Sequence, residues 1–137
     1  MSEDKIIEKI LKNSKTIAVV GFSSHPSRAG YYVPAYLYAQ GYRIIPVNPY
    51  LHTEAFGEKP HPDLLSIREP VDLVLIFRRS EHVLPVVEEA IQIGARAVWM
   101  QLGIVNEEAA VLARNAGLDV VMNACMLVEH RNRSHVL

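Results

Sequence analysis

The chain has 137 residues, with 14 Lys and Arg against 15 Asp and Glu, and half of its residues are apolar. This composition excludes a wholly disordered chain, and a net charge of −1 argues against attachment to nucleic acid or an anionic membrane through bulk positive charge. The length fits one domain, so we expect residues 1–137 to form a single unit.

Short β-rich runs alternate with helical patterns along the chain, which predicts a parallel sheet with helices on both faces. The apolar spacing over residues 3–13 predicts an amphipathic helix. The nearly all-apolar run at residues 16–22 predicts a central strand that is buried on both faces. A second helix is expected over residues 31–40, and a second, short strand over residues 43–47.

The next connection, residues 50–70, is long and rich in turn formers. We expect one short helix in it, around residues 63–67, because a structureless loop of this length is unusual. Residues 72–77 are predicted to form the third strand. The helix after this strand is expected to begin between residues 80 and 83 and to end at Gly94.

Residues 97–102 and 119–122 are predicted to be the fourth and fifth strands. Between them, Asn106 is expected to cap a helix that ends at Gly117. The tail, residues 123–137, is polar and slightly basic, and its pattern predicts no definite element. Five strands and at least four helices in a chain of this length predict a Rossmann-like, doubly wound α/β domain.

The first strand-to-helix turn, residues 21–30, carries groups suited to an anion. Ligands of doubly wound folds bind beyond the carboxyl ends of the strands. Gly21 permits a close backbone approach, and Arg28 offers a bidentate phosphate partner beside the free N–H groups of a helix start. The turn does not match G-x-G-x-x-G, because Ser23 replaces the second glycine. A solvated turn whose serines only cap the helix is the alternative interpretation.

The ends of the second and third strands weigh against ordinary use of NAD. An NAD site prefers an acidic residue after the second strand, but Asn48 and Pro49 stand there. Arg78 and Arg79 follow the third strand, so together with Arg28 they predict a local excess of positive charge at one sheet edge. A ligand with several phosphates would use such an edge.

Five segments occur in this order along the chain: VVGFSSHPSRAGYYVPAYL, IIPVNP, VDLVLIFRRSEHV, GARAVWMQLGI and NACMLVEH. Together they resemble the stand-alone bacterial and archaeal CoA-binding proteins, which are similar to the amino-terminal CoA-binding domain of the succinyl-CoA synthetase alpha subunit. The resemblance extends from about residue 6 to residue 130. It implies a Rossmann-type sheet of strand order 3-2-1-4-5 that binds coenzyme A at its carboxyl edge.

The resemblance also implies the contacts with coenzyme A. The expected contacts are Gly21, Ser23, Ser27 and Arg28 at the pyrophosphate, with Phe22 in the same turn; Asn48 and Pro49 on the adenosine side; Phe77, Arg78 and Arg79 at the adenine and its phosphates; and Gln101 and Gly103 near the pantetheine arm. Relatives usually carry an arginine before the cysteine, where this chain has Ala124. Any contact made by that arginine is absent here.

The resemblance does not imply an activity, because the ligase also needs a domain with a phosphorylatable histidine and a nucleotide-binding partner subunit. His25 and His82 flank the expected ligand edge, but neither has a carboxylate at a telling spacing. No spacing typical of a metal site occurs. We therefore expect no catalytic residue and no metal.

The single cysteine, Cys125, excludes an intrachain disulfide framework. We expect a buried, inert thiol, and the alternative is a mixed disulfide with the thiol of CoA. The amino terminus is charged from its third residue, so it does not resemble a secretory signal. The longest run without Asp, Glu, Lys or Arg has 14 residues, so we expect no membrane span and a cytoplasmic location.

The function that the sequence favours is binding of coenzyme A or an acyl-CoA by a non-catalytic carrier, sensor or accessory module. One alternative is an NAD(P)-binding oxidoreductase or reductase subunit, in which Arg78 or Arg79 would hold a ribose phosphate. Another is an interaction module that presents bound CoA to a separate enzyme. A homodimer or a partner enzyme is compatible with each, and no nucleic-acid or membrane partner is expected.

Overall fold

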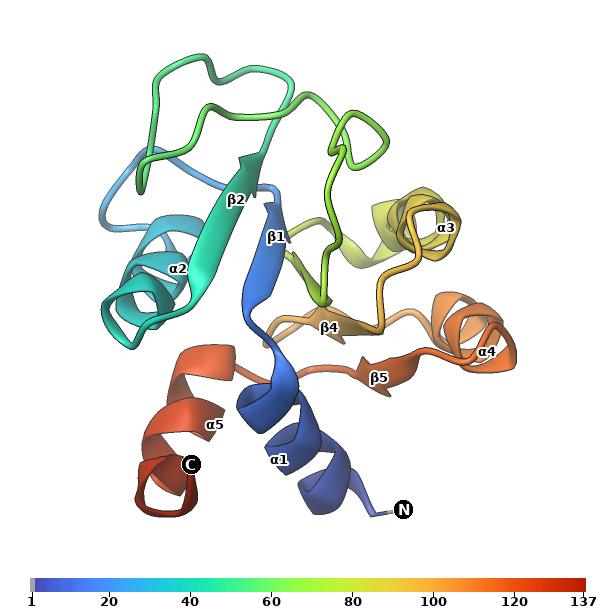
Figure 1. The fold of residues 1–137 in the computed structure, drawn as a ribbon. Coiled ribbons are helices and arrows are strands. Elements are labelled where there is room, and N and C mark those ends of the chain that lie inside the picture. Colours follow the sequence, from blue (N-terminus) through green and yellow to red (C-terminus); the bar gives the residue numbers. More distant parts are fainter. Residues whose placement is uncertain (1) are drawn as a thin grey trace.

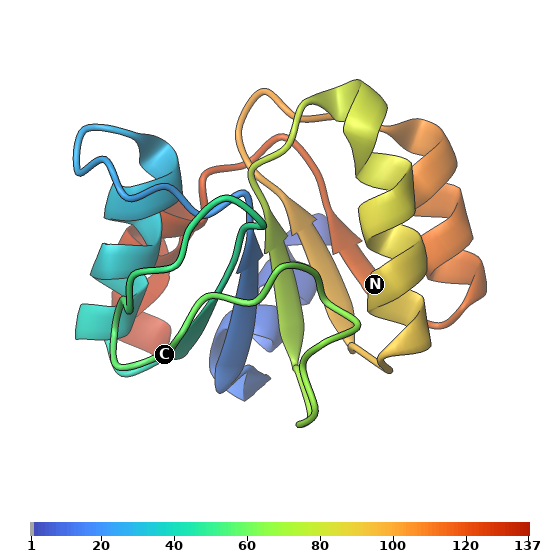
Figure 2. The ribbon, with the colours of Figure 1, turned by 90° about the horizontal axis from the view of Figure 1, so that it is seen from above.

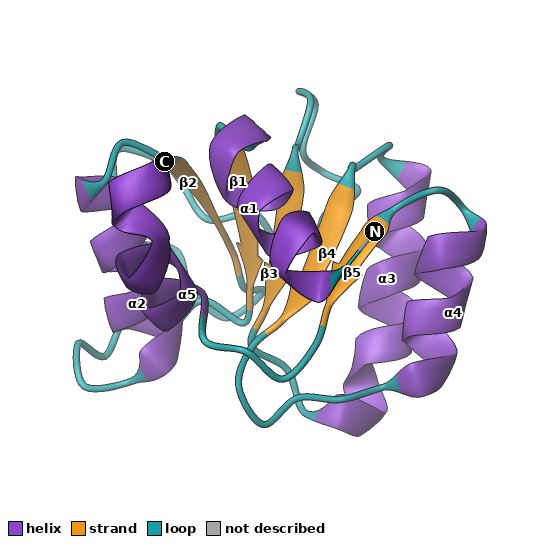
Figure 3. Ribbon diagram, turned by 90° about the horizontal axis from the view of Figure 1, so that it is seen from below, coloured by secondary structure: helices purple, strands orange, loops and turns teal. Residues whose placement is uncertain are grey.

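A five-stranded parallel sheet lies between two layers of helices in the computed structural model, which describes residues 2–137 (Figure 1). In chain order the elements are α1 (Glu3–Asn13), β1 (Thr16–Val20), α2 (Ala29–Ala39), β2 (Arg43–Val47), β3 (Leu73–Ile76), the 3₁₀ turn η1 (Ser80–His82), α3 (Val83–Gln92), β4 (Ala97–Met100), α4 (Glu107–Asn115), β5 (Asp119–Val121), α5 (Met126–Arg133) and the 3₁₀ turn η2 (Ser134–Val136). Helices α1, α2 and α5 cover one face of the sheet, and α3 and α4 cover the other (Figure 3). Within residues 2–137, no helix has both the length and the apolar character needed to cross a bilayer.

The strands are almost entirely apolar because helices cover both faces of the sheet. In β1, Val19 packs toward α2 and α5, and its neighbours Ala18 and Val20 pack toward α3 and α4. The same alternation places the fully buried Trp99 of β4 in the α2 layer, where its Nε1 donates a 2.8 Å hydrogen bond to the carbonyl of Ala124. The prediction of a doubly wound α/β fold is confirmed.

The strand order is β2-β1-β3-β4-β5, so the order 3-2-1-4-5 implied by the resemblance is wrong. His61 pairs with the outer edge of β2, where a third strand would otherwise bind, and its N–H donates to the carbonyl of Pro46 at 2.9 Å. Residues 48–72 then arch over the end of the sheet and enter β3 on the other side of β1 (Figure 1 and Figure 2). Asp72 fixes that position, because its Oδ2 accepts bonds of 2.9 Å from the N–H groups of Lys15 and Thr16.

The winding of the sheet therefore reverses between β1 and β3. From β1 the chain adds β2 on one side, and from β2 it crosses back to add β3 on the other. At such a reversal the two crossover connections diverge, which leaves a crevice at the carboxyl ends of the central strands. The structure thus places the expected ligand edge after β1 and β3.

The short helix predicted at residues 63–67 is wrong, because this segment forms a single turn. The Asp63 carboxylate accepts a 2.9 Å bond from the N–H of Ser66, and the N–H of Ile67 donates to the carbonyl of Leu64 at 3.0 Å. These contacts resemble the first turn of a helix. A continuing helix would need an N–H group at residue 70, which is a proline.

The tail for which the sequence predicts no element contains α5, which packs beside α2 and α1. The side chain of Gln101 lies directly after β4 and is buried, and its Oε1 accepts a 3.2 Å bond from the N–H of Met126 at the start of α5. His130 of α5 is 7% exposed, and its Nδ1 lies 2.9 Å from the hydroxyl of Tyr36 in α2. Its ring also meets Tyr42 edge-on, with centroids 5.8 Å apart.

We expect the stability of the protein to fall as the pH drops below about 6.5. Burial lowers the pKa of His130 below its usual value of 6.5. The unfolded chain therefore binds a proton at this histidine in a pH range where the folded protein does not, so acid favours unfolding. Denaturant titrations at about pH 7.5 and about pH 5.5 would measure the loss. It should be smaller in His130→Gln than in the exposed control His135→Gln, and equal losses in both variants would exclude His130 as the source.

Candidate functional site

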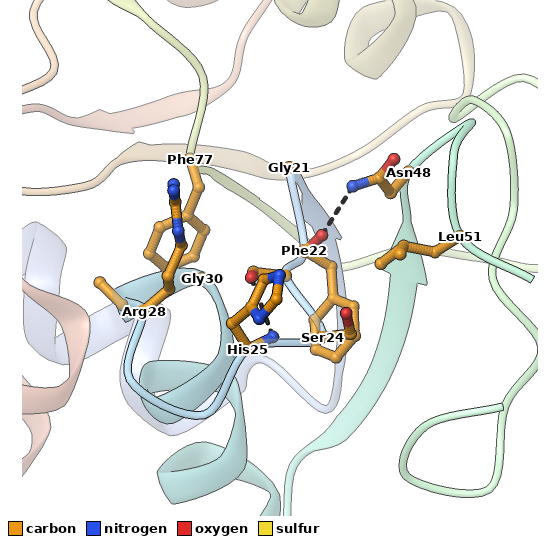
Figure 4. Close-up of a pocket in the computed structure, with 11 residues that line it drawn as sticks. Gly21, Phe22, Ser24, His25, Arg28, Gly30, Asn48, Leu51 and Phe77 are labelled. Atoms are coloured by element: carbon orange, nitrogen blue, oxygen red, sulfur yellow. Dashed lines mark hydrogen bonds between the residues drawn. The ribbon is translucent and has the colours of Figure 1, made fainter. Parts of the chain in front are cut away.

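A cavity of about 460 Å³ opens where β1 and β3 end (Figure 4). Its wall comes from the turn after β1, the start of α2 and the first residues after β2 and β3. The lining residues are Gly21, Phe22, Ser23, Ser24, His25, Arg28, Ala29, Gly30, Asn48, Leu51 and Phe77. In Figure 4, Arg28 and Phe77 lie at one side of this cavity, and Asn48 and Leu51 lie at the other. We call it the switch-point cavity.

Two glycines allow the turn after β1 to pack closely against its neighbours. Gly21 has a φ of +85°, and a Cβ added there would lie 2.5 Å from the carbonyl oxygen of Phe77. A Cβ added at Gly30 would lie 3.0 Å from the carbonyl oxygen of Gly21. At Gly21 the turn therefore meets the residue after β3 with no room for a side chain, and at Gly30 the start of α2 packs tightly against the turn.

The start of α2 leaves its positive end available at the cavity. Arg28 occupies the N-cap position, and no side chain among residues 2–137 caps this helix. The hydroxyl of Ser23 instead accepts a 3.1 Å bond from the N–H of His25, which shapes the turn. The first N–H groups of an uncapped helix have no acceptor within the helix, so they bind water or an anion. The guanidinium of Arg28 adds a full positive charge beside them.

Asn48 connects the loops after β1 and β2. Its Nδ2 donates a 2.8 Å bond to the carbonyl of Phe22 (Figure 4), and its Oδ1 accepts a 2.9 Å bond from the N–H of Tyr50. The second bond closes a turn that brings Leu51 back to the cavity. The amide that stands where an NAD site prefers an acid thus shapes this wall of the cavity.

The structure brings together half of the twelve residues predicted to bind the ligand. Six of them line the switch-point cavity: Gly21, Phe22, Ser23, Arg28, Asn48 and Phe77. Ser27, Pro49 and Arg79 are exposed and are not part of its wall. Gln101 accepts a hydrogen bond from the start of α5, and the N–H of Gly103 donates a 2.8 Å bond to the side chain of Asn123. Both residues therefore connect the loop after β4 with the segment after β5.

Arg78 lies in a different cavity, of about 140 Å³, on the α3 side of the sheet. It shares that cavity with the carboxylates of Asp63 and Glu89. Its Nε is buried and has no hydrogen-bond partner within residues 2–137. Of the three arginines expected at one edge, Arg28 alone lines the switch-point cavity.

The sequence-based set lacks Leu51 and four neighbours of the predicted turn residues: Ser24, His25, Ala29 and Gly30. Gly30 precedes the helix predicted over residues 31–40, so its position at the second residue of α2 and its close approach to Gly21 were not predicted. Leu51 carried no signal in the sequence, since its place depends on the turn closed by Asn48.

Cys125 is half-buried at the N-cap position of α5 and does not line the cavity. No group of three His, Cys, Asp or Glu side chains in the described part of the chain could hold a metal ion.

The chain is similar to other proteins over most of its length. YneT of Bacillus subtilis, which is described as uncharacterized, is 44% identical over 124 residues, which are 90% of this chain and 91% of that protein. A protein of solved structure from Thermus thermophilus has a TM-score of 0.90 and 39% identity over 96% of this chain and 98% of its own.

A larger protein contains a similar unit. The dinucleotide-forming acetyl-coenzyme A synthetase 1 of Ca. Korarchaeum cryptofilum has a TM-score of 0.73 and 25% identity, covering 88% of this chain but only 31% of the synthetase. The family described as CoA binding domain matches residues 15–131, which include every residue that lines the switch-point cavity. The chain therefore belongs to the family of CoA-binding domains.

Proposed function

We propose that the whole chain is one CoA-binding module, which binds coenzyme A or an acyl-CoA in the switch-point cavity and has no chemistry of its own. One observation carries the proposal: the cavity lies where the winding of the sheet reverses, and the uncapped start of α2, Gly21 and Arg28 meet there. A role as carrier, sensor or accessory module follows from binding without catalysis.

The residues present fit a diphosphate. The two glycines let the turn after β1 pack closely against Phe77 and the start of α2, since a Cβ at Gly21 or Gly30 would meet the carbonyl oxygen of Phe77 or of Gly21. In the proposal, the N–H groups at the start of α2 and the guanidinium of Arg28 hold the pyrophosphate. Coenzyme A supplies the thiol that carries an acyl group, and the protein binds and orients its phosphates.

The other residues implied by the resemblance stay candidate contacts around this cavity. Ser27, Pro49 and Arg79 are exposed, so a bound ligand that extends from the cavity could reach them. Gln101 and Gly103 remain the candidates for the pantetheine arm. Each of these assignments can be tested by replacing the residue with alanine, or with asparagine in the case of Gln101.

Isothermal titration calorimetry with CoA, acetyl-CoA, NAD, NADP and ATP tests the proposal. We expect CoA or acetyl-CoA to bind more tightly than the other three nucleotides. A saturating concentration, about 100 times the dissociation constant, should stabilise the protein by about 2.7 kcal/mol, which a thermal-shift assay detects. Tighter binding of NAD or NADP would favour the oxidoreductase, and no preference for CoA would contradict the proposal.

A further inference from the structure

The segment between β2 and β3, residues 48–72, forms one wall of the ligand site although it contains no helix or strand. Its residues Asn48 and Leu51 line the switch-point cavity, and the rest of it runs past the outer edge of β2 and over the end of the sheet (Figure 2). A connection of this length without secondary structure is unusual, so its course depends on contacts made along its length. We call this segment the arch.

Arg43, the first residue of β2, binds the arch at two points. Its Nε and Nη2 donate hydrogen bonds of 3.0 Å to the two carboxylate oxygens of Glu58. Its Nη1 and Nη2 donate to the two carboxylate oxygens of Glu69, and the bond from Nη2 has a length of 2.9 Å. One guanidinium thus makes two bidentate pairs, which fix the direction of both glutamate side chains as well as their distance.

The charges around Arg43 differ from those of an ordinary surface ion pair. The hydrogen bond from Arg43 holds the pKa of Glu69 below its usual value, and the bonds to Glu69 and Glu58 raise the pKa of Arg43 above its usual value. An isolated ion pair on the surface stabilises a protein little. Here two carboxylates share one cation, so removal of the guanidinium would leave two like charges side by side. Repulsion would then separate the two parts of the arch that Arg43 now holds together.

A short chain of contacts leads from these glutamates to the ligand site. His61 follows Glu58 closely in the arch, and its N–H donates to the carbonyl of Pro46 at 2.9 Å. The carbonyl of His61 accepts a 2.9 Å bond from the N–H of Asn48. The side chain of Asn48 in turn donates to the carbonyl of Phe22 at the cavity. The position of the arch on the outer edge of β2 therefore sets the position of Asn48.

The side chain of His61 joins this contact to the part of the arch that leads to Glu69. The hydroxyl of Ser66 donates its single hydrogen to the carbonyl of Asp63 at 2.9 Å, so it can only accept a bond from His61. Nδ1 of His61 therefore carries the hydrogen of the 3.1 Å bond between these two side chains. Residues 61–66 thus form one hydrogen-bonded unit between the two glutamates that Arg43 binds.

We propose that Arg43 is a positioning residue for ligand binding. It does not line the switch-point cavity. It holds Glu58 and Glu69 together, so the hydrogen-bonded unit between them stays on the outer edge of β2. That unit in turn keeps Asn48 and Leu51 at the wall of the cavity, which lies at the other end of β2. This inference rests on the proposed function, because it concerns how tightly the site binds coenzyme A.

Arg43→Ala tests the proposal from one side of the contact, and the double variant Glu58→Gln with Glu69→Gln tests it from the other. Titration calorimetry should show about tenfold weaker binding of CoA by each variant, which lies in the range known for residues that act on a site without touching its ligand. The variant with all three substitutions should bind CoA no more weakly than Arg43→Ala, because all three remove the same contact.

Arg133→Ala is the matched control. Arg133 also joins two carboxylates, but these belong to Asp4 in α1 and Glu129 in α5. Its alanine variant should have a lower thermal midpoint and the wild-type affinity for CoA. Circular dichroism verifies that each variant is folded, and the glutamate variant decides if Arg43→Ala is not. Wild-type affinity in the folded Arg43 or glutamate variant, or an equal loss in Arg133→Ala, would overturn the inference while the proposed function stands.

Amide hydrogen exchange tests the hold of Arg43 on the arch without any ligand. The N–H groups of Asn48 and His61 should exchange about tenfold faster in Arg43→Ala than in the wild type, and at the wild-type rate in Arg133→Ala. If the wild type does not bind CoA, the proposed function is contradicted. Unchanged exchange at Asn48 and His61 in Arg43→Ala would separately show that Arg43 does not position the arch.

Discussion

The substitution Gly21→Ala should destabilise the protein by about 3 kcal/mol and abolish binding of CoA. The new Cβ would lie 2.5 Å from the carbonyl oxygen of Phe77, and the backbone cannot relax freely because the N–H of Gly21 donates a 3.0 Å bond to Val47. Relief of the clash would separate β1 from β3 at the cavity. Thermal unfolding should show a midpoint about 10 °C lower, and calorimetry should show no heat of CoA binding.

Gly103→Ala is a matched control for this effect. Gly103 has the same φ of +85°, but nothing lies within 4 Å of a Cβ built there. Its alanine variant therefore carries the backbone strain without the clash and should lose only about 1 kcal/mol. Equal losses of stability in the two variants would show that the close approach of Phe77 is not what makes Gly21 necessary.

The sequence predicts the elements of this fold better than their arrangement. The apolar run of β1 and the cap at Asn106, whose side chain accepts a 2.9 Å bond from the N–H of Ala109, are local signals, and both are confirmed. The strand order depends on Asp72 meeting the N–H groups of Lys15 and Thr16, 57 and 56 residues away in sequence. No local pattern records such a contact, so the order was open to error.

In the candidate site, too, the sequence predicts groups that are close along the chain better than contacts between distant segments. The glycine, serines and arginine of the first turn are adjacent in sequence, and the structure keeps most of them together. Phe77 and Arg78 are also adjacent, yet they line different cavities on opposite sides of the sheet. Successive side chains of an extended segment point to opposite faces, so two consecutive residues after a strand rarely serve one ligand group. No local pattern predicts the position of Phe56, because it lies in a turn with a φ of +56° and packs against three rings from elsewhere in the chain.

Because Arg28 lines the switch-point cavity and Arg78 lines another cavity, we expect Arg28 to bind the phosphates. Arg28→Ala should weaken CoA binding by about tenfold to a hundredfold, because a charge-assisted hydrogen bond to an anion is lost. The thermal midpoint without ligand should not change, since Arg28 is exposed and makes no ion pair within residues 2–137. If Arg28 holds the pyrophosphate, the factor should be the same for CoA and for dephospho-CoA, which differ only at the 3′-phosphate.

Arg114→Ala removes the same charge from the exposed last turn of α4, on the other face of the sheet, and should leave CoA affinity unchanged. This control separates a specific contact from the general loss of one positive charge, whose effect is weak because salt screens exposed charges over about 8 Å. A loss for CoA that disappears with dephospho-CoA would move Arg28 from the pyrophosphate to the 3′-phosphate. A folded Arg28→Ala variant with wild-type affinity for both ligands would mean that the start of α2 binds the phosphates through its N–H groups alone.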